Sequence, residues 1–455
     1  MGILSDVTEG LGLGDPVVRI GVTGLSRAGK TVFITSLVAN LLERGRMQAL
    51  RAAADGRLRA VWLQPQPDDT IPRFDYERHL AALTGPEPHW PDGTRHVSQL
   101  RLSMRLEGGG LFGLRGSRNL HVDIVDYPGE WLLDLRLMDR DFDRWSAEVL
   151  DRIPGRPKAD AFLAALSATG PDDPFREPVA QDLADRYTAH LVAARAAGWS
   201  DCTPGRFLIP GELAGSPALT FAPLPPELLP GKLGREFRRR FEAYKSRVVR
   251  PFFRDHFARI DRQVVLVDVL GAIHQGPRAV EDTRRAMAEV LGAFRPGRAG
   301  WLAQLLGTRR VERILFAATK ADHLHHHQHN RLTAILSAML REARDRADFQ
   351  GARTEAMAIA ALRATTEEIV PHEGGDLPVV RGQLLDGRRA AFFAGELPSD
   401  PGLLLHPARQ GAERWLDGDY AIMNFAPAPL TLRPGDGPPH IRLDRAAEFL
   451  IGDRL

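Results

Sequence analysis

Short apolar runs alternate with amphipathic stretches along this chain, a pattern typical of α/β proteins. The runs at residues 17–23, 262–270 and 311–318 are mostly apolar, which predicts buried strands of a parallel sheet. Residues 97–106 instead alternate apolar and polar positions, so we expect a strand with one buried face. Together with the strand expected at residues 119–126, this segment predicts a hairpin at an antiparallel edge of the sheet.

Helical periodicity marks other segments. From Thr31 onward apolar residues recur at helical spacing, and Gly45 is the expected stop. Residues 234–253 place aromatic and aliphatic side chains on one face of a helix, with arginines around it. Such a helix either packs on its own domain or lies on acidic lipid, and the sequence leaves both interpretations open. Residues 376–398 predict a strand-turn-strand, and residues 443–455 predict a terminal helix.

Composition narrows the function classes. The chain has 455 residues, enough for more than one domain, and its net charge of +2 gives no support for a nucleic-acid partner. A single cysteine excludes a disulfide framework and a cysteine-rich zinc site. No apolar run approaches about 18 residues and the chain does not begin with a signal-peptide pattern, so we expect a cytoplasmic protein. Only five basic residues are lysines, so each lysine is a candidate for a specific role.

Residues 24–31, GLSRAGKT, match the phosphate-loop pattern G-x-x-x-x-G-K-T between an expected strand and an expected helix. Backbone N–H groups of such a loop converge on an anion, and the helix N-terminus adds its positive dipole. We expect Lys30 to reach the β- and γ-phosphates and the Thr31 hydroxyl to ligate Mg²⁺. Arg27 either adds charge near the phosphates or points outward from the loop. The predicted phosphate-binding residues are Ser26, Arg27, Ala28, Gly29, Lys30, Thr31 and Val32.

Two further motifs indicate which nucleotide is bound. Asp126 and Gly129 form a D-x-x-G after an apolar strand, so Asp126 is expected to hold Mg²⁺ through water and the Gly129 N–H to meet the γ-phosphate. Residues 319–322, TKAD, resemble the [NT]-K-x-D motif of GTPases. There the aspartate, here Asp322, accepts hydrogen bonds from guanine N1–H and the 2-amino group, and the lysine stem, here of Lys320, lies along the purine. Adenine lacks both donors, which favours GTP and GDP over ATP.

Weaker signals suggest further nucleotide contacts. Thr94 stands where a switch threonine would close on Mg²⁺ and the γ-phosphate, and Arg95 beside it could contact phosphate. Trp90 is a candidate to pack on the base or sugar, although a purely structural loop explains this segment as well. His323 follows the guanine motif. Leu362, within Ala361–Arg363 at the end of the expected strand 355–362, stands where GTPases place a loop whose backbone N–H meets guanine O6.

Catalysis would depend on Lys30 as the main fixed charge and on Glu130, which follows the D-x-x-G motif. Many GTPases carry a water-orienting glutamine at that position. A carboxylate there could orient the attacking water or take its proton.

Several longer strings resemble the YcjX-like family of bacterial P-loop proteins: DYPGEWLLDL (126–135), IPRFDYERHLAALTG (71–85), HWPDGTRHVSQLRL (89–102) and IDRQVVLVDVLG (260–271). The resemblance implies an α/β fold, namely a Ras-like P-loop NTPase core with a mostly parallel sheet and large helical insertions. It also implies GTP/GDP binding and membership of a bacterial stress-response group. The expected parts are residues 1–130 as the first part of the core, with a switch insertion at 46–97, then a helical insertion at 131–260, the second part of the core at 261–370, and a hairpin-and-helix extension at 371–455.

Two hypotheses about activity remain open. The first is a slow Mg²⁺-dependent GTPase that acts as a nucleotide-controlled switch in bacterial stress response. The second is a nucleotide-gated scaffold or membrane-stress adaptor with negligible hydrolysis. Guanine nucleotide is the expected partner in both, with a peripheral inner-membrane or membrane-protein partner considered in addition and no nucleic acid expected. The histidine tract at residues 323–329 resembles a metal-binding tract, but a solvated helix start is the favoured interpretation.

Overall fold

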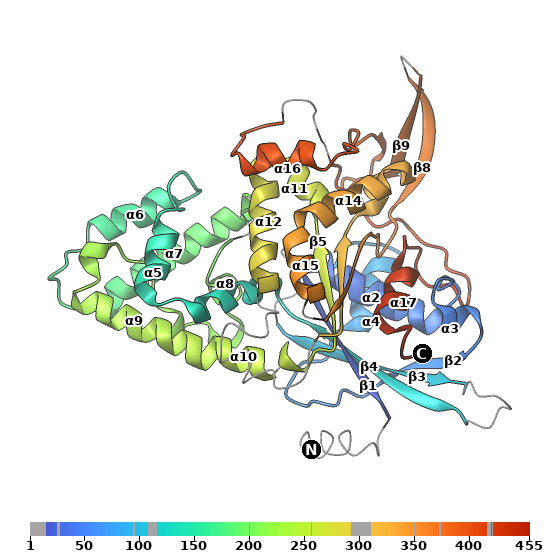
Figure 1. Ribbon diagram of the computed structural model, residues 1–455, viewed down its shortest axis with the longest axis horizontal. Coiled ribbons are helices and arrows are strands. Elements are labelled where there is room, and N and C mark those ends of the chain that lie inside the picture. Colours follow the sequence, from blue (N-terminus) through green and yellow to red (C-terminus); the bar gives the residue numbers. More distant parts are fainter. Residues whose placement is uncertain are drawn as a thin grey trace. The chain divides into compact units, whose positions relative to one another are not determined.

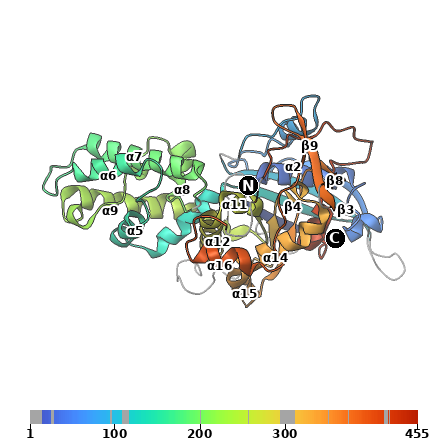
Figure 2. The same ribbon diagram turned by 90° about the horizontal axis from the view of Figure 1, so that it is seen from above.

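The computed structural model contains two compact units (Figures 1 and 2). The first consists of Met1–Tyr127, Ile260–Val280 and Arg310–Leu455, and the second of Pro128–Arg259 and Glu281–Arg309. The residues that the structure describes are 15–24, 28–93, 96–107, 116–199, 201–255, 257–292, 311–349, 351–372, 375–415, 420 and 422–455.

A seven-stranded sheet forms the centre of the first unit, in the order β2-β3-β4-β1-β5-β6-β7. Its strands are β1 (Val17–Gly24), β2 (Leu58–Gln64), β3 (Ser98–Leu106), β4 (Arg118–Asp126), β5 (Arg262–Val267), β6 (Arg313–Ala318) and β7 (Arg353–Ala358). The five neighbouring strands β4, β1, β5, β6 and β7 run parallel, while β3 is antiparallel to both β2 and β4. The predicted α/β fold with a mostly parallel sheet and an antiparallel hairpin is therefore confirmed. The edge strand β2 was not anticipated.

Helices cover both faces of this sheet (Figure 1). Alternate residues of β5 and β6, such as Leu266 and Leu315, join the core that α2 (Lys30–Glu43) and α17 (Leu443–Ile451) complete. The residues between them, such as Phe316, point to the opposite face, where α14 (His329–Met339) packs on β6 and β7. The remaining helices of this unit are α3 (Arg51–Ala54), α4 (Tyr76–Thr84), α11 (Val269–Gln275), α15 (Arg341–Phe349) and α16 (Gly402–Arg409).

A smaller antiparallel sheet in the first unit has the order β10-β9-β8. Its strands are β8 (Thr365–His372), β9 (Gly375–Gln383) and β10 (Arg389–Phe392). The predicted strand-turn-strand corresponds to β9 and β10, and the predicted terminal helix corresponds to α17, so both are confirmed.

The second unit is helical. Its elements include η1 (Gly129–Asp139), α5 (Phe142–Leu150), α6 (Ala159–Ser167), α7 (Glu177–Ala196), α8 (Gly205–Leu208), α9 (Lys232–Tyr244), the π-helical turn η5 (Lys245–Val249) and α10 (Arg250–Asp255), while α12 (Pro277–Gly292) begins in the first unit. Trp145 stacks on Phe241 with ring centroids 5.2 Å apart. Phe237, Phe241 and Tyr244 are fully buried, so the apolar face of α9 packs within its own unit, which favours the first of the two interpretations.

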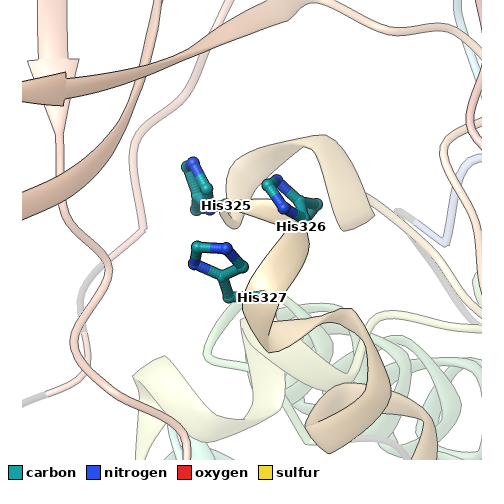
Figure 3. A group of neighbouring side chains, drawn as sticks. All are labelled: His325, His326 and His327. Atoms are coloured by element: carbon teal, nitrogen blue, oxygen red, sulfur yellow. The ribbon is translucent and has the colours of Figure 1, made fainter.

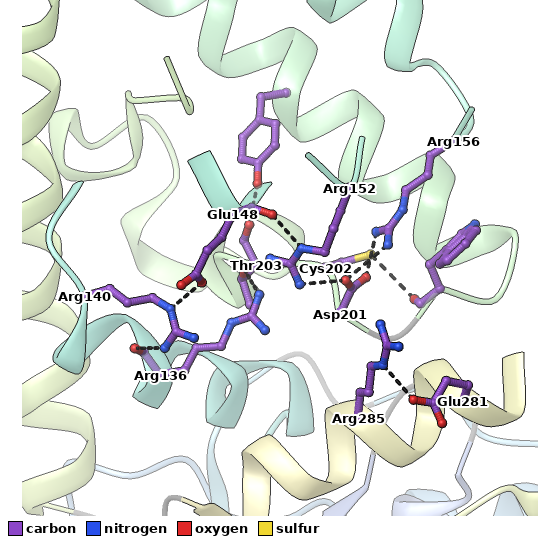
Figure 4. Close-up of polar contacts among 12 residues, drawn as sticks. Arg136, Arg140, Glu148, Arg152, Arg156, Asp201, Cys202, Thr203, Glu281 and Arg285 are labelled. Atoms are coloured by element: carbon purple, nitrogen blue, oxygen red, sulfur yellow. Dashed lines mark hydrogen bonds and ion pairs between the residues drawn. The ribbon is translucent and has the colours of Figure 1, made fainter. Parts of the chain in front are cut away.

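An ion-pair cluster also stabilises the helical unit (Figure 4). Arg152 and Arg156 both bind the carboxylate of Asp201, at 3.0 and 2.7 Å. The guanidinium groups hold the pKa of Asp201 below its ordinary value, although burial acts in the opposite direction and is the largest single influence. Arg156 also lies over the ring of Trp199, 4.0 Å from its centroid.

Among the described residues, no helix combines the length and the apolarity needed to cross a bilayer.

Candidate functional site

A pocket of about 480 Å³ lies in the first unit, among segments that follow the carboxyl ends of β1, β6 and β7. Ligands of open parallel sheets bind at this end of the strands. Residues 28–33 of the phosphate-loop region line one part of the pocket, and Thr319, Lys320, Asp322 and His323 line another. Segments almost 300 positions apart in the chain therefore meet around one cavity, whose volume falls in the range of small-ligand sites.

Gly24 and Gly29, at the two ends of the phosphate loop, have conformations or contacts that favour glycine. A Cβ at Gly24 would lie 2.6 Å from the carbonyl oxygen of Leu266, so only glycine lets β1 pass β5 so closely at this point. Gly29 has φ +81°, a left-handed conformation that glycine adopts at little cost, and it caps the start of α2. Ala28, Thr31 and Val32 line the pocket at this helix start.

Lys30, the first residue of α2, directs its side chain to the end of β1, where its Nζ donates a hydrogen bond to the Gly24 carbonyl oxygen at 2.8 Å. The side chain is about 9% exposed, and it lines the pocket. This position holds a positive charge at the pocket wall before any ligand is bound. Ser26 and Arg27, also predicted to bind phosphate, lie outside the described residues.

Asp322, the last residue of the T-K-A-D motif, is 5% exposed. Its Oδ2 accepts a hydrogen bond from the Ala364 N–H at 2.9 Å, and its backbone oxygen accepts one from the Thr365 hydroxyl. These two hydrogen bonds tie the T-K-A-D turn to the segment that leads into β8. Asp322 can thus be held in place by one carboxylate oxygen while the other serves a ligand.

Lys320 has φ 60°, a left-handed conformation that is uncommon for a residue other than glycine. Its ammonium group pairs with the carboxylate of Asp268, which also caps α11 by accepting from the Gly271 N–H at 2.9 Å. With its end fixed in this way, the stem of Lys320 lines the pocket wall. Asp268 was missed by sequence reasoning, although it directly follows a predicted parallel strand, where functional side chains are common.

Aromatic residues complete the wall of the pocket. The Trp90 indole N–H donates to the Phe425 carbonyl oxygen at 2.7 Å, so its polar edge has a hydrogen-bond partner in the fold. Trp90 is itself part of the pocket wall. His323 packs edge-on against Phe425, with centroids 5.3 Å apart, and burial lowers the pKa of His323. Leu362 is also buried in the pocket lining. Thr94 and Arg95 lie outside the described residues.

Asp126 ends β4, and its backbone pairs in parallel register with Val22 of β1, two residues before Gly24. The side chain is only 2% exposed. Thr31, at the start of α2, is similarly buried at 7%. A hydroxyl and a carboxylate at the adjacent ends of a P-loop and a neighbouring strand fit a Mg²⁺ ion, which prefers oxygen ligands.

Comparisons with known proteins agree with this geometry. The model of the YcjX-like family, DUF463, matches residues 18–455. The chain belongs to the YcjX-like family. Relatives named "Ras-like GTPase YcjX" are 36% identical in Escherichia coli (strain K12), covering 97% of this chain and 96% of the relative, and 35% identical in Shewanella oneidensis, covering 97% and 95%. The family resemblance inferred from the sequence strings is therefore confirmed, together with a Ras-like architecture for the α/β fold.

Gly129 and Glu130 belong to the second unit of this YcjX-like protein, at the start of η1. The Glu130 carboxylate is 5% exposed and pairs with Arg195 of α7, whose Nη2 lies 2.8 Å from Oε1. The Glu130 backbone is also closely packed: Gly205 lies so near it that a Cβ at position 205 would come within 2.1 Å of the Glu130 carbonyl oxygen. Neither Gly129 nor Glu130 is among the residues that line the 480 Å³ pocket, and the pairing with Arg195 was not anticipated.

The C-terminal segment of this YcjX-like chain also supplies pocket residues that sequence reasoning missed. Leu385, Asn424 and Phe425, from the expected hairpin-and-helix extension, line the pocket. Leu385 follows β9, and its N–H donates to the Asn424 carbonyl oxygen at 3.3 Å. These residues carry no motif, so their position depends on the tertiary fold alone.

The histidine tract differs in part from the expected solvated helix start. His326 and His327 are exposed, as that interpretation requires, but His323, His325 and His329 are buried. His329 uses Nε2 to donate to the carbonyl oxygen of Ala321 at 2.8 Å, which fixes the T-K-A-D turn to the start of α14. Within the tract, His329 is thus a structural histidine, while His326 and His327 form an exposed pair.

Proposed function

We propose that this chain binds GTP and GDP in the 480 Å³ pocket and hydrolyses GTP slowly with Mg²⁺, acting as a nucleotide-controlled switch. The observation that carries the proposal is that Lys30, Thr31 and Asp322 line one cavity. A phosphate-binding loop and a base-recognising carboxylate are the two ends of a nucleotide site. The name "Ras-like GTPase" of two relatives, each matching nearly the whole chain, supports the same proposal.

Guanine is the expected base because Asp322 is a buried acceptor. Its Oδ2 is engaged by the Ala364 N–H, and guanine N1–H and the 2-amino group would supply donors to the carboxylate. Adenine offers no donor at those positions, so an adenine nucleotide would desolvate the carboxylate without compensation. Trp90 and the stem of Lys320 are proposed to contact the faces and edges of the purine or its sugar.

Thr31 and Asp126 would hold Mg²⁺, which neutralises phosphate charge when it is bound. The chain itself contributes Lys30, whose ammonium group would exchange its hydrogen bond with the Gly24 carbonyl oxygen for phosphate oxygens. Loop N–H groups and the α2 N-terminus add fixed positive potential. Phosphoryl transfer needs such electrostatic stabilisation and an aligned water more than it needs covalent chemistry from the protein.

Glu130 is the proposed water-orienting residue, and its environment also supports the alternative proposal. Within the helical unit, the Glu130 carboxylate is paired with Arg195. The same ion pair occupies the group that would orient water, which favours a scaffold with negligible hydrolysis. The two functions differ in turnover, not in nucleotide affinity.

The cellular role is proposed from the family resemblance alone: a part in bacterial stress response, in the cytoplasm, with a partner at the inner membrane. The apolar face of α9 does not supply a lipid-binding surface for that partner, since Phe237 and Phe241 are fully buried within the helical unit.

The test uses purified full-length protein, from which bound nucleotide has been removed. Fluorescent GDP is displaced with unlabelled GDP, GTP or ADP, and GTP turnover is then measured with and without Mg²⁺. We expect GDP to compete at least about 100-fold better than ADP, as two hydrogen bonds to a charged group imply. Equal competition by ADP would refute guanine binding. If the protein binds GTP tightly but shows no Mg²⁺-dependent turnover, the proposal of a slow GTPase is refuted and the proposal of a nucleotide-gated scaffold takes its place.

A further inference from the structure

Three consecutive histidines, His325, His326 and His327, gather their rings at one turn of the first unit (Figure 3). Their ring centroids lie between 4.1 and 4.5 Å apart. Each offers one ring nitrogen such that all three nitrogens lie within 4.8 Å of one another. The turn is the 3₁₀ helix η8 (His326–Gln328), with His325 at its N-cap. None of the three lines the nucleotide pocket.

A carboxylate stands beside this cluster. Glu367 extends from β8, and its Oε2 lies 2.5 Å from Nδ1 of His326 and 3.7 Å from Nε2 of His325. A histidine whose one nitrogen is bound to a carboxylate presents the other nitrogen in a fixed tautomer, the arrangement found around metal-ligating histidines. Glu367 therefore does for His326 what an outer-shell carboxylate does in a metal site.

His325 supplies the second, independent sign of a ligand. The side chain is only 5% exposed, so it is held in place by the fold. Its Nδ1 atom is buried, and no hydrogen-bond partner for that atom occurs among the described residues. A buried polar atom of this kind normally has a partner, and a metal ion would provide one.

We propose that His325, His326 and His327 bind a late first-row divalent metal ion, with Zn²⁺ as the representative. Neutral imidazole nitrogens suit zinc, copper and nickel, whereas Mg²⁺ and Ca²⁺ prefer oxygen ligands. With Zn–N bonds of about 2.0–2.1 Å, tetrahedral ligand nitrogens lie about 3.4 Å apart, so nitrogens that are now within 4.8 Å of one another must approach by up to about 1.4 Å. Two of the three side chains are exposed and can make that adjustment. Water, or Glu367 after a rotamer change, completes the tetrahedron.

The location gives the ion a structural consequence. Through His326 and Glu367 it would connect η8 to β8, and both elements border the Asp322 turn, whose backbone oxygen is bound by the Thr365 hydroxyl at the start of β8. The metal site does not depend on the proposed nucleotide chemistry, because it uses neither Thr31 nor Asp126.

The test requires full-length protein without a polyhistidine tag, stripped with a chelator and titrated with Zn²⁺ in competition with a chromophoric chelator. Co²⁺ is added separately, since tetrahedral Co²⁺ has an intense visible absorption. We expect one equivalent of Zn²⁺. The double variant His326→Asn/His327→Asn should weaken affinity at least about 100-fold, because it removes two of three ligands. Both side chains are exposed, so the variant is expected to fold, which circular dichroism would verify.

Matched variants separate this site from other binding. His406→Asn, at an exposed histidine of α16, should leave Zn²⁺ affinity unchanged. Glu367→Gln should weaken it about 10- to 100-fold, while Glu368→Gln, on the next residue of β8, should not, since Glu368 pairs with Arg381 instead. Absence of stoichiometric Zn²⁺, or equal affinity in wild type and the double variant, would overturn the proposal. So would Zn²⁺ that GDP displaces and that Thr31→Ala abolishes, because that ion would occupy the phosphate site.

Discussion

Replacing Asp322 with asparagine should reverse base preference without disturbing the fold. In the wild type, Oδ2 accepts from the Ala364 N–H at 2.9 Å, and that donor is fixed by the backbone. An asparagine must therefore keep its amide oxygen at this place, which puts its NH₂ group where Oδ1 stood. A hydrogen-bond donor then replaces an acceptor on the side that we expect to meet the base.

The size of the effect follows from the two hydrogen bonds that the substitution removes. A hydrogen bond to a charged group contributes about 1.5–3 kcal/mol, and guanine brings two donors to this carboxylate. Removal of both costs at least about 3 kcal/mol, or roughly 150-fold in Kd. Xanthine carries an oxygen in place of the 2-amino group, so the asparagine NH₂ can donate to it. Xanthine diphosphate should then bind Asp322→Asn better than GDP does.

The assay is displacement of fluorescent GDP and of a fluorescent xanthine diphosphate analogue, with thermal unfolding as the check on structure. Asp348→Asn, at an exposed aspartate of α15 in the same unit, is the matched control and should change neither affinity. Asp322→Ala, which removes the partner of the Ala364 N–H, should lower the unfolding temperature, whereas Asp322→Asn should not. Unchanged GDP affinity in a folded Asp322→Asn variant would refute the assignment of Asp322 to the base.

Three further outcomes are expected. Lys30→Ala should weaken GTP and GDP binding at least about 100-fold by calorimetry, since it removes charge-assisted hydrogen bonds; normal binding would make the loop purely structural. Glu130→Ala should lower GTP turnover at least about tenfold at nearly unchanged GTP affinity, while equal turnover would remove Glu130 from the mechanism. Burial raises the pKa of Asp134 from 3.8 to about 6 against the opposing hydrogen bond from Tyr244. This group's stabilising contribution is complete below pH 3.8 and disappears as the pH rises through about 6, so a carboxyl-resolved NMR titration should find one aspartate with a midpoint near 6.

The strands that could be predicted are those whose own sequence has a clear hydrophobic pattern. The runs at residues 17–23 and 262–270 are mostly apolar, which favours buried parallel strands, and β1 and β5 occupy those places. The edge strand β2 was missed because its residues after Leu58 are only half-buried or exposed, which weakens the alternation. Its strand character depends on pairing with β3, more than 30 positions later in the chain.

The same division holds at the site. Gly29, Lys30 and Asp322 could be named from sequence because a motif fixes their spacing. Asp268 and Phe425 could not, since their roles arise from side chains that meet only after folding: an ion pair to Lys320, and a carbonyl oxygen that holds the Trp90 indole.

The C-terminal segment after β9 forms part of the pocket and holds neighbouring elements of the pocket in place. Phe425 holds Trp90 and His323 in the pocket wall, by a hydrogen bond from the Trp90 indole and a ring contact with His323. On the side of α2, the Asn40 amide donates to the Pro438 carbonyl oxygen at 3.0 Å, and Ala360, which lines the pocket, forms a β-bridge with Ile441. A helix that presents Lys30 at its first residue is thus fixed at its other end by the last part of the chain. The loop motif is encoded locally. Its helix is held by a hydrogen bond from Asn40 to Pro438, 398 positions later in the chain, and the pocket wall is held by one from Trp90 to Phe425, 335 positions later.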